Sequence, residues 1–320
     1  MIVSAPASIA NLGCLFDLAA LAVRCARDTV VAEPIDEPKI EVVSQCKEVP
    51  SGKGNTAYYA AEAVLSELGL KDVVGVRISV FKGVEVGVGL GSSAATAAAT
   101  AMAVNETFEG RLSTEVLIRV AGEGERAAAG VPHYDNVSAS LLGGMILITN
   151  RKPLRVIRLD PPKGLKIIIL KPKMRTTREK TRSMRSVLPR SIALNDMVEH
   201  NSAAVEFMVG LMRGDVEELG RAINRGGVIE KVRSKFIPHY QEIKREALKA
   251  GGLGVNISGA GPSMFIITRA EEVIEVKERI ERYLSLLKWR GEVIMTEPDE
   301  RGAVKERDIS LSTSSLGVHQ

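Results

Sequence analysis

The chain has 320 residues, of which 45% are hydrophobic and 26% charged, and this length predicts about two domains with a full-sized core. Such a composition argues against disordered, collagen-like and coiled-coil proteins. The net charge of +4 is small and indicates only a mild preference for anionic small molecules, while an aromatic content of 4% disfavours a base-stacking nucleic-acid surface.

The three cysteines, Cys14, Cys25 and Cys46, cannot all pair and do not have the spacing of metal ligands. This pattern predicts free thiols in a reducing cytoplasm. No apolar run reaches the ~18 residues that a membrane span needs. The first residues lack the basic and apolar regions of a secretory signal. We therefore expect a cytoplasmic protein with neither a membrane nor a nucleic acid as partner.

The first half of the chain alternates strand and helix patterns, each bounded by turn residues. Asn55 or Thr56 is expected to cap the first helix, which Gly69 ends. The alanines of the first strand pattern leave a helix open there. In chain order, the predicted elements are one or two strands at 19–31, a helix at 55–68, a strand at 73–80, helices at 92–108 and from 113 into the 120s, and a strand at 145–149.

The second half is richer in helix. Its predicted elements are a strand at 167–170, helices at 191–213, 215–225, 242–249 and 270–287, and two short strands flanking a glycine-rich turn within 255–268. The last ~20 residues predict a strand and a frayed tail. Since a loop-rich half gives way to a helix-rich half, we expect two domains, 1–155 and 156–320.

The strongest local motif is a glycine-rich run before the long helix, Gly87-Val88-Gly89-Leu90-Gly91-Ser92-Ser93-Ala94-Ala95. Glycines at every second position let backbone amides approach an anion, and the serines open a helix whose N-terminus favours negative charge. The run lacks the Gly-Lys-Ser/Thr of a P-loop and the spacing of a dinucleotide fingerprint. It predicts a phosphate loop, with a plain serine-capped turn as the alternative.

This run resembles the ATP-binding motif of the GHMP kinases, and two further stretches match that family in the same order. Pro6-Ala7-Ser8-Ile9-Ala10-Asn11-Leu12-Gly13 with Phe16-Asp17 is similar to the first motif, and Ile257-Ser258-Gly259-Ala260-Gly261-Pro262-Ser263 to the third. The resemblance implies a two-domain α+β fold. Its N-terminal domain would be like domain 2 of ribosomal protein S5, and its C-terminal domain ferredoxin-like.

Within the family, the finer match is to the homoserine kinases. His133-Tyr134-Asp135-Asn136-Val137 is similar to their substrate segment, and the stretches 185–189 and 230–233 follow their pattern. The resemblance implies ATP-dependent phosphorylation of the L-homoserine hydroxyl to O-phospho-L-homoserine, a step toward threonine. It also implies Mg²⁺ as a cofactor and a possible homodimer.

The resemblance assigns roles to individual residues. The implied substrate-binding residues are Asn11, Asp17, His133, Asn136, Arg185 and Arg233. The implied nucleotide-binding residues are Asn55, Glu85, Val86, Gly87, Val88, Gly89, Leu90, Gly91, Ser92, Ser93, Ala94, Ala95, Gly259 and Gly261. The implied metal ligands are Ser93 and Glu125, and the catalytic candidates are Asn11, Asp135, Asn136 and Thr181.

These residue types suit the chemistry of a zwitterionic alcohol. Arginines at 185 and 233 offer a planar bidentate donor for a carboxylate, and Asp17 offers a partner for an ammonium. Phosphoryl transfer asks mainly for positioning and charge neutralisation, so we expect catalysis by alignment without a dedicated base. A proton relay through His133 and Asp135 would require that segment to be extended.

Several alternatives stay open. Glu125 could lie on a solvated helix face, Asn55 could simply cap its helix, and Asp135 could be a base, a cap or a partner for an arginine. The substrate could be another alcohol of the family, such as shikimate or mevalonate. The chain could also be a non-catalytic ATP-binding regulator. A nucleic-acid binder would rest on the basic segment 171–190 alone.

Overall fold

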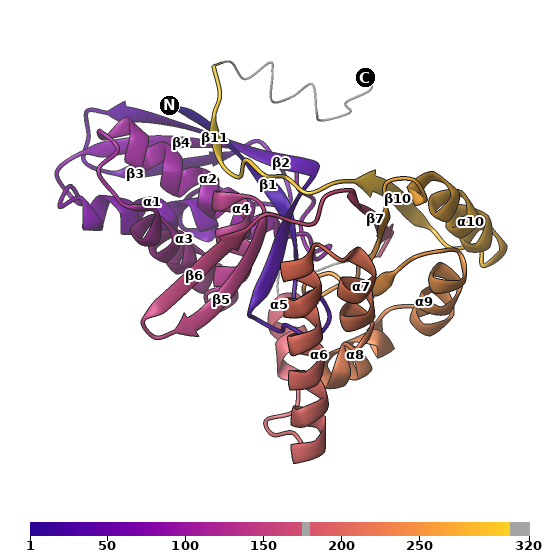
Figure 1. Ribbon diagram of the computed structural model, residues 1–320. Helices are drawn as coiled ribbons and strands as arrows, with labels where there is room; N and C mark the ends of the chain where they lie inside the picture. Colours follow the sequence, from indigo (N-terminus) through magenta and orange to yellow (C-terminus); the bar gives the residue numbers. More distant parts are fainter. Residues whose placement is uncertain (175–179, 308–320) are drawn as a thin grey trace.

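The computed structural model describes residues 1–174 and 180–307, and the side chains of residues 127–129 and 180–181 lie outside that description. Its two β-sheets are each covered by helices (Figure 1). In that view the first half of the chain lies on the left and the second half on the right, and the final strand returns to the left. The fold therefore has two layered halves that the end of the chain ties together.

The first sheet has seven strands, with the central order β11-β1-β2-β4-β3 and with β5 paired to β2 and β6 to β5. Of its neighbouring pairs, β3 and β4 are parallel and the others antiparallel. The strands are β1 (Ile2–Ala10), β2 (Ala19–Ile35), β3 (Ile40–Ser44), β4 (Gly75–Phe81), β5 (Met145–Arg151), β6 (Leu154–Leu159) and β11 (Val304–Lys305).

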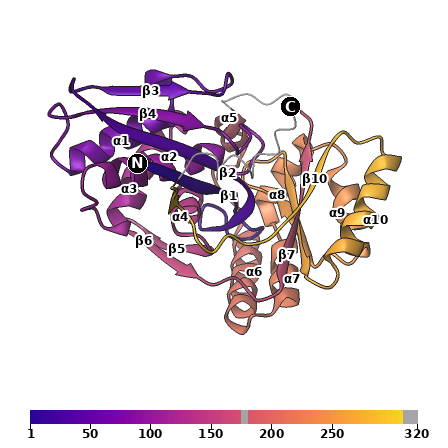
Figure 2. The same ribbon diagram turned by 90° about the horizontal axis from the view of Figure 1, so that it is seen from above.

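Helices cover one face of this sheet, as Figures 1 and 2 show. The helices α2 and α4 pack on β1 and β2, while α1 and α3 pack against α2. They are α1 (Thr56–Glu67), α2 (Ser92–Thr107), α3 (Thr114–Ala129) and α4 (Tyr134–Leu142). The alanine-rich α2 is buried along nearly its whole length, because small side chains let it lie close to the sheet.

The helix starts predicted by capping residues are confirmed. Asn55 Oδ1 accepts a hydrogen bond from the Ala57 N–H at 2.9 Å, and the Ser113 side chain accepts one from the Val116 N–H. Residues 19–31, where the sequence left helix and strand open, lie within strand β2. Tertiary packing decides this case, since Ala19 is completely buried between neighbouring elements.

The second sheet is antiparallel and has the order β10-β7-β9-β8. Numbered along the chain, its strands follow the order 4-1-3-2 of a ferredoxin-like βαββαβ unit, which confirms the expected fold class. The strands are β7 (Leu165–Pro172), β8 (Gly254–Ile257), β9 (Met264–Arg269) and β10 (Gly291–Thr296). The helices of this half are α5 (Lys180–Ser186), α6 (Leu194–Arg213), α7 (Val216–Asn224), α8 (Gly227–Arg233), α9 (Tyr240–Lys249) and α10 (Val273–Leu286).

The two halves share a hydrophobic core. Buried Ile9 and Leu21 of the first sheet belong to the same cluster as Ile167, Phe207 and Phe265 of the second half. Strand β6 crosses the predicted boundary at residue 155, and β11 pairs with β1. The division into 1–155 and 156–320 stays a prediction. Among the described helices, none is both long and apolar enough to cross a membrane.

Candidate active site

All three sequence motifs converge on one cavity between the two halves of the molecule. Turns of the first and third motifs, the glycine-rich run, α3, α4, α5 and α8 contribute to its wall. The predicted residues that line it are Asn11, Asp17, Asn55, Val86, Gly87, Gly89, Gly91, Ser92, Ser93, Ala94, Glu125, His133, Asp135, Asn136, Arg185, Arg233, Gly259 and Gly261. Residues separated by most of the chain therefore face the same space.

The glycine-rich run has the backbone that its sequence predicts. Gly87, Gly89 and Gly91 all have positive φ, and α2 begins directly after them at Ser92. A Cβ atom on Gly89 would lie 2.5 Å from the Ser258 carbonyl oxygen, so this position requires glycine. The free N–H groups at the start of α2 open toward the cavity, which makes this end of the helix suited to an anion.

The third motif closes tightly on this loop. The Ser258 hydroxyl donates to the Gly89 carbonyl at 2.6 Å, and the Ser263 N–H donates to the Val88 carbonyl at 3.2 Å. The Gly259 N–H donates to the Ala10 carbonyl of the first motif at 3.1 Å. The predicted approach of the C-terminal half to the phosphate loop is thus confirmed.

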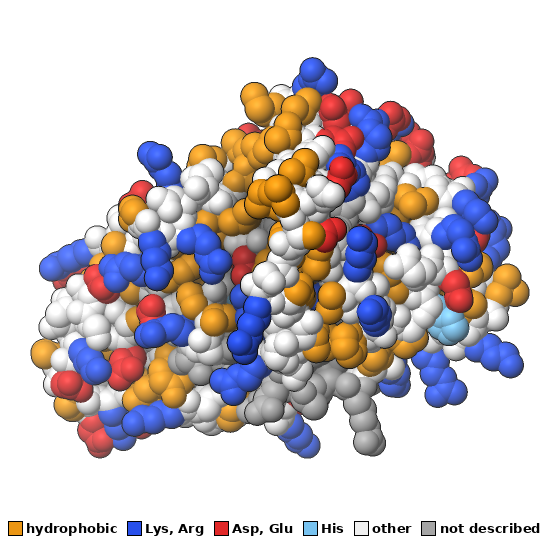
Figure 3. Space-filling model, turned by 90° about the horizontal axis from the view of Figure 1, so that it is seen from below, with side chains coloured by type: hydrophobic (Ala, Val, Ile, Leu, Met, Phe, Trp, Pro, Cys, Tyr) orange, Lys and Arg blue, Asp and Glu red, His pale blue; other side chains and the backbone are white. Residues whose placement is uncertain are grey.

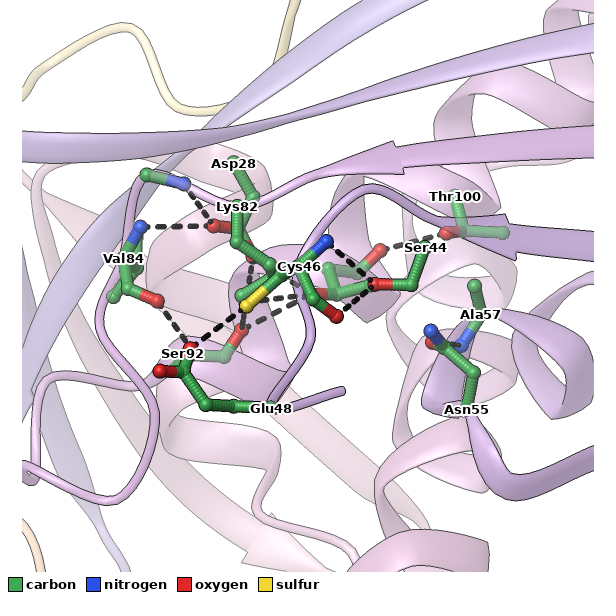
Figure 4. Close-up of polar contacts among 12 residues, drawn as sticks. Asp28, Ser44, Cys46, Glu48, Asn55, Ala57, Lys82, Val84, Ser92 and Thr100 are labelled. Carbon is green, nitrogen blue, oxygen red and sulfur yellow. Dashed lines mark hydrogen bonds and ion pairs between the residues drawn. The ribbon is translucent and has the colours of Figure 1, made fainter. Parts of the chain in front are cut away.

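A buried ion pair supports both ends of the phosphate loop, and the sequence analysis missed it. Asp28, completely buried on β2, accepts hydrogen bonds from the N–H groups of Gly83 and Val84 and forms an ion pair with Lys82 (Figure 4). Lys82 Nζ also donates to the Ser92 carbonyl at 2.9 Å and contacts the Thr96 hydroxyl. The only sequence signal was Lys82, which stands five residues before the glycine-rich run.

Four predicted nucleotide residues do not line the cavity. The side chains of Val88, Leu90 and Ala95 are buried in the shared core. Glu85 is exposed and pairs with Lys171 of β7. Gly87, Gly89 and Gly91 line the cavity, while the side chains of Val88 and Leu90 between them turn into the core.

Asn11 and Asn136 both stabilise the architecture of the site. Asn11 Nδ2 donates to the Gly259 carbonyl at 2.9 Å, and its Oδ1 accepts from the Asp17 N–H at 3.0 Å. Asn136 Oδ1 accepts from the Ser8 hydroxyl at 2.9 Å. Each asparagine therefore links the first motif to another segment while it faces the cavity.

Two arginines lie over the ring of Phe16, and one of them, Arg185, pairs with Asp17. Arg185 Nη2 donates to both oxygens of Asp17, at 2.9 and 2.7 Å. Buried Arg233 donates to the Gly259 carbonyl at 2.9 Å, and both guanidinium groups lie over the Phe16 ring at 5.5 and 5.1 Å. Burial lowers the pKa of Arg233 to about 10, so its guanidinium is still charged at neutral pH.

Glu125 is buried, which decides against the solvated helix face that the sequence left open. Its Oε2 lies 2.9 Å from His133 Nδ1. Burial lowers the pKa of His133, but the Glu125 carboxylate outweighs it and the net pKa is raised. Among the described residues, Glu125 Oε1 has no hydrogen-bond partner.

Asp135 is also buried, in the first turn of α4, where its Oδ1 accepts from the Asn136 N–H at 2.8 Å. Burial, and then the nearby Asp17 carboxylate, raise the pKa of Asp135 to about 6. His133 hydrogen-bonds to Glu125, and the described residues contain no hydrogen bond between His133 and Asp135. The described contacts therefore do not form the proton relay between His133 and Asp135.

Asn55 and Thr181, two further residues predicted for the site, belong to the start of α1 and to α5. Asn55 lines the cavity and caps α1, and its Nδ2 also donates to the Pro50 carbonyl at 2.9 Å. Thr181 belongs to α5, but its side chain lies outside the described part of the structure.

Comparison with known proteins agrees with this architecture. The family model "GHMP kinases N terminal domain" matches residues 55–144, and "GHMP kinases C terminal" matches residues 207–286. The homoserine kinase of Methanopyrus kandleri is 38% identical over 284 residues, which cover 88% of this chain and 92% of that protein. The homoserine kinase of Methanococcus vannielii is 35% identical over 279 residues, covering 86% and 90%.

Solved structures give the same result. The crystal structure of homoserine kinase from Cytophaga hutchinsonii is 30% identical, superposes with a TM-score of 0.88, and is matched over 95% of this chain and 96% of that one. The mevalonate kinase of Methanococcus jannaschii has a TM-score of 0.71 at 16% identity, over 93% and 98% of the two chains. This second likeness shows the fold alone.

Proposed function

The chain belongs to the GHMP kinase family, and we propose that it transfers the γ-phosphoryl group of ATP to the hydroxyl of L-homoserine. The products would be ADP and O-phospho-L-homoserine, a step toward threonine. The observation that carries the proposal is a single cavity in which an anion-binding loop faces buried Glu125 and the Asp17, Arg185 and Arg233 charges. The names of the relatives support homoserine as the alcohol.

The phosphates of ATP fit the glycine-rich loop. Positive φ at Gly87, Gly89 and Gly91 turns backbone N–H groups toward the cavity, where they meet the N-terminal end of α2. Ser92 contributes to the loop itself, since its hydroxyl donates to the Val84 carbonyl at 2.7 Å. Backbone amides of the glycine-rich loop and of the start of α2 would therefore position the phosphates.

The residues present suit Mg²⁺. The orphaned Oε1 of Glu125 and the Ser93 hydroxyl are hard oxygen donors on one cavity, and magnesium needs only one or two protein oxygens. The described residues contain no cluster of three or more His, Cys, Asp or Glu side chains that would suit a transition metal instead. When bound, Mg²⁺ neutralises charge on the transferred phosphoryl group.

The opposite charges on the other side of the cavity suit an amino acid. Asp17 offers a carboxylate for the ammonium of homoserine, and Arg185 and Arg233 offer guanidinium groups for its carboxylate. Because Asp17 and Arg185 pair with each other, a zwitterion would have to take over both charges. Shikimate and mevalonate have no ammonium group to do this.

We infer that the reaction proceeds by alignment and charge stabilisation. Asn11 and Asn136 would orient the hydroxyl, which then attacks the γ-phosphorus while ADP leaves, and the hydroxyl proton passes to the transferred phosphate or to solvent. Thr181 remains a proposed contact near the phosphate. The three free thiols are consistent with a cytoplasmic enzyme.

The direct test is coupled ADP release with Mg²⁺-ATP against L-homoserine, shikimate, mevalonate and galactose. We expect turnover on homoserine alone. Turnover on another alcohol would keep the phosphate loop and remove the assigned roles of Asp17, Arg185 and Arg233. ATP binding without turnover on any alcohol would favour a regulatory protein.

A further inference from the structure

Arg233, which lines the cavity, ends a short helix that has little apolar anchorage. Helix α8 has seven residues, all of them described, and Arg233 is the only buried one. Gly226, which precedes the helix, has no side chain to accept hydrogen bonds from its first turn. The helix lies low in the molecule beside α6, on a side where charged and apolar side chains are interspersed (Figures 1 and 3). A buried apolar face therefore does not fix the position of Arg233.

The carboxylate of Glu230, one turn before the end of α8, holds the helix instead. Its side chain is only 10% exposed, and both oxygens are hydrogen-bonded. Oε1 accepts from the Tyr240 hydroxyl at 2.9 Å and from Lys244 Nζ at 2.6 Å. Oε2 accepts from the Gly226 N–H at 3.2 Å and from Asn256 Nδ2 at 3.1 Å. This one carboxylate therefore joins α8 to α9 and to β8.

The donors to this carboxylate are themselves held in place. Lys244 Nζ also donates to the Asn224 carbonyl at 3.0 Å, and Asn256 Nδ2 donates to the Ile223 carbonyl at 2.8 Å, both at the end of α7. Burial, and then the nearby carboxylate, raise the pKa of Tyr240, so its hydroxyl keeps the proton that it donates. Removing the carboxylate charge would leave several of these buried donors without an acceptor.

The network reaches the cavity by two routes. Arg233 Nη1 donates to the Gly259 carbonyl at 2.9 Å, and Arg233 Nε donates to the Met184 carbonyl at 3.4 Å. Asn256 belongs to β8, the strand that leads into the turn containing Gly259. Glu230 therefore fixes both the arginine and the turn that the arginine contacts.

We propose that Glu230 is a positioning residue for the acceptor alcohol and acts through Arg233, which it holds at the wall of the cavity. The inference rests on the proposed function, because it takes Arg233 as the partner of the substrate carboxylate. The described lining of the cavity does not include Glu230. The phosphate loop keeps its own hydrogen bonds to the third motif, so the role of Glu230 should appear in the binding of homoserine rather than of ATP.

The first test compares Michaelis constants by coupled ADP release. Glu230→Gln should raise the KM for homoserine by about 5- to 20-fold, because an amide presents N–H groups where acceptors are needed. The KM for ATP and the kcat should each stay within about 3-fold of wild type. Glu242→Gln on α9 is the matched control, since Glu242 pairs with His239 at the surface. An unchanged KM for homoserine, or an equal rise in the KM for ATP, would overturn the proposal.

A double-mutant cycle tests whether Glu230 acts through Arg233. Arg233→Gln alone should raise the KM for homoserine by about 10- to 100-fold. Adding Glu230→Gln should change it no further, because the group to be positioned is gone. If the two effects multiply instead, Glu230 acts by another route and the proposal is wrong.

A readout without substrate separates this inference from the proposed function. The Arg233 Nε–H is buried and hydrogen-bonded, so its NMR signal, identified by its loss in Arg233→Lys, should exchange slowly with water. Glu230→Gln should speed this exchange by about 10-fold or more, and Glu242→Gln should leave it unchanged. Unchanged exchange in Glu230→Gln would overturn the positioning role. A wild-type protein that does not phosphorylate homoserine would overturn the proposed function instead.

Discussion

Arg185 Nη2 donates to both carboxylate oxygens of Asp17, at 2.9 and 2.7 Å, although 168 residues separate the two in the chain. The guanidinium also lies over the ring of Phe16, which precedes Asp17. One positive and one negative charge therefore stand together at the wall of the cavity. A zwitterionic substrate could replace this contact only by engaging both groups, and we therefore propose that the pair selects for amino acids.

The first prediction concerns this pair. Arg185→Gln should raise the KM for homoserine by about 10- to 100-fold, because it removes charge-assisted hydrogen bonds, and should change the KM for ATP much less. Steady-state ADP release measures both constants. Arg190→Gln is the matched control, since Arg190 belongs to the same basic segment but is exposed. Equal effects of the two substitutions would mean that only the charge of the segment matters.

The second prediction concerns Glu125. Glu125→Gln should increase the Mg²⁺ concentration needed for half-maximal activity by about 10- to 100-fold, since a neutral amide is a poorer magnesium ligand. It should also lower the pKa of His133, which the carboxylate now raises, and NMR titration would show that change. Glu123→Gln on the same helix is the control, because Glu123 pairs with Arg126 at the surface. An unchanged Mg²⁺ requirement in Glu125→Gln would remove the assigned metal role.

The third prediction separates alignment from base catalysis at Asp135. Asp135→Asn should retain kcat to within a few-fold, because the amide oxygen of the new side chain can still accept the hydrogen bonds that Asp135 Oδ1 accepts from Asn136. A base mechanism would instead cost about 100-fold or more. Single-turnover kinetics with homoserine would distinguish the two.

The fourth prediction is the pH dependence of stability that Asp135 causes. Its pKa is raised by burial from 3.8 to about 6 in the folded protein, so the stability that it contributes is full below pH 3.8 and is lost as the pH rises through about 6. Relative to wild type, Asp135→Asn should therefore be more stable at pH 7 than at pH 4. Thermal unfolding at the two pH values measures this, with exposed Asp36→Asn as the control. A difference of the opposite sign would contradict the assigned burial.

The fifth prediction concerns the contact between the phosphate loop and the third motif. In Gly89→Ala the new Cβ would lie 2.5 Å from the Ser258 oxygen and 2.7 Å from the Gly261 oxygen. The loop would have to shift, and ATP affinity measured by calorimetry should fall by about 5- to 100-fold. Gly164→Ala is the control, because its φ is also positive but its Cβ would meet nothing within 4 Å. Equal loss of ATP affinity in both variants would point to backbone strain alone.

The sequence by itself determined the elements and the chemistry that depend on neighbouring residues. The phosphate loop was predictable because its glycines and serines act through backbone conformation and the start of the following helix. The cap at Asn55 was predictable for the same reason. The resemblance to the homoserine kinases added expected roles for residues that lie far apart in the chain, which no local pattern could connect. The sequence did not predict β1, β3, β6, β10, α4, α5 and α8, most of which are too short to carry a clear periodicity.

Only the tertiary structure decided which of these residues meet. The Asp28–Lys82 pair joins residues 54 apart, and it depends on the pairing of β2 with β4 rather than on either local sequence. Burial of Glu125 follows from the packing of α3 against α1, α2 and α4. The turning of Val88 and Leu90 into the core follows from the packing of the phosphate loop against the second sheet. Long-range contacts of this kind are fixed by the path of the whole chain. The sequence specifies these contacts only through the packing of the whole chain. No local sequence pattern therefore reveals them.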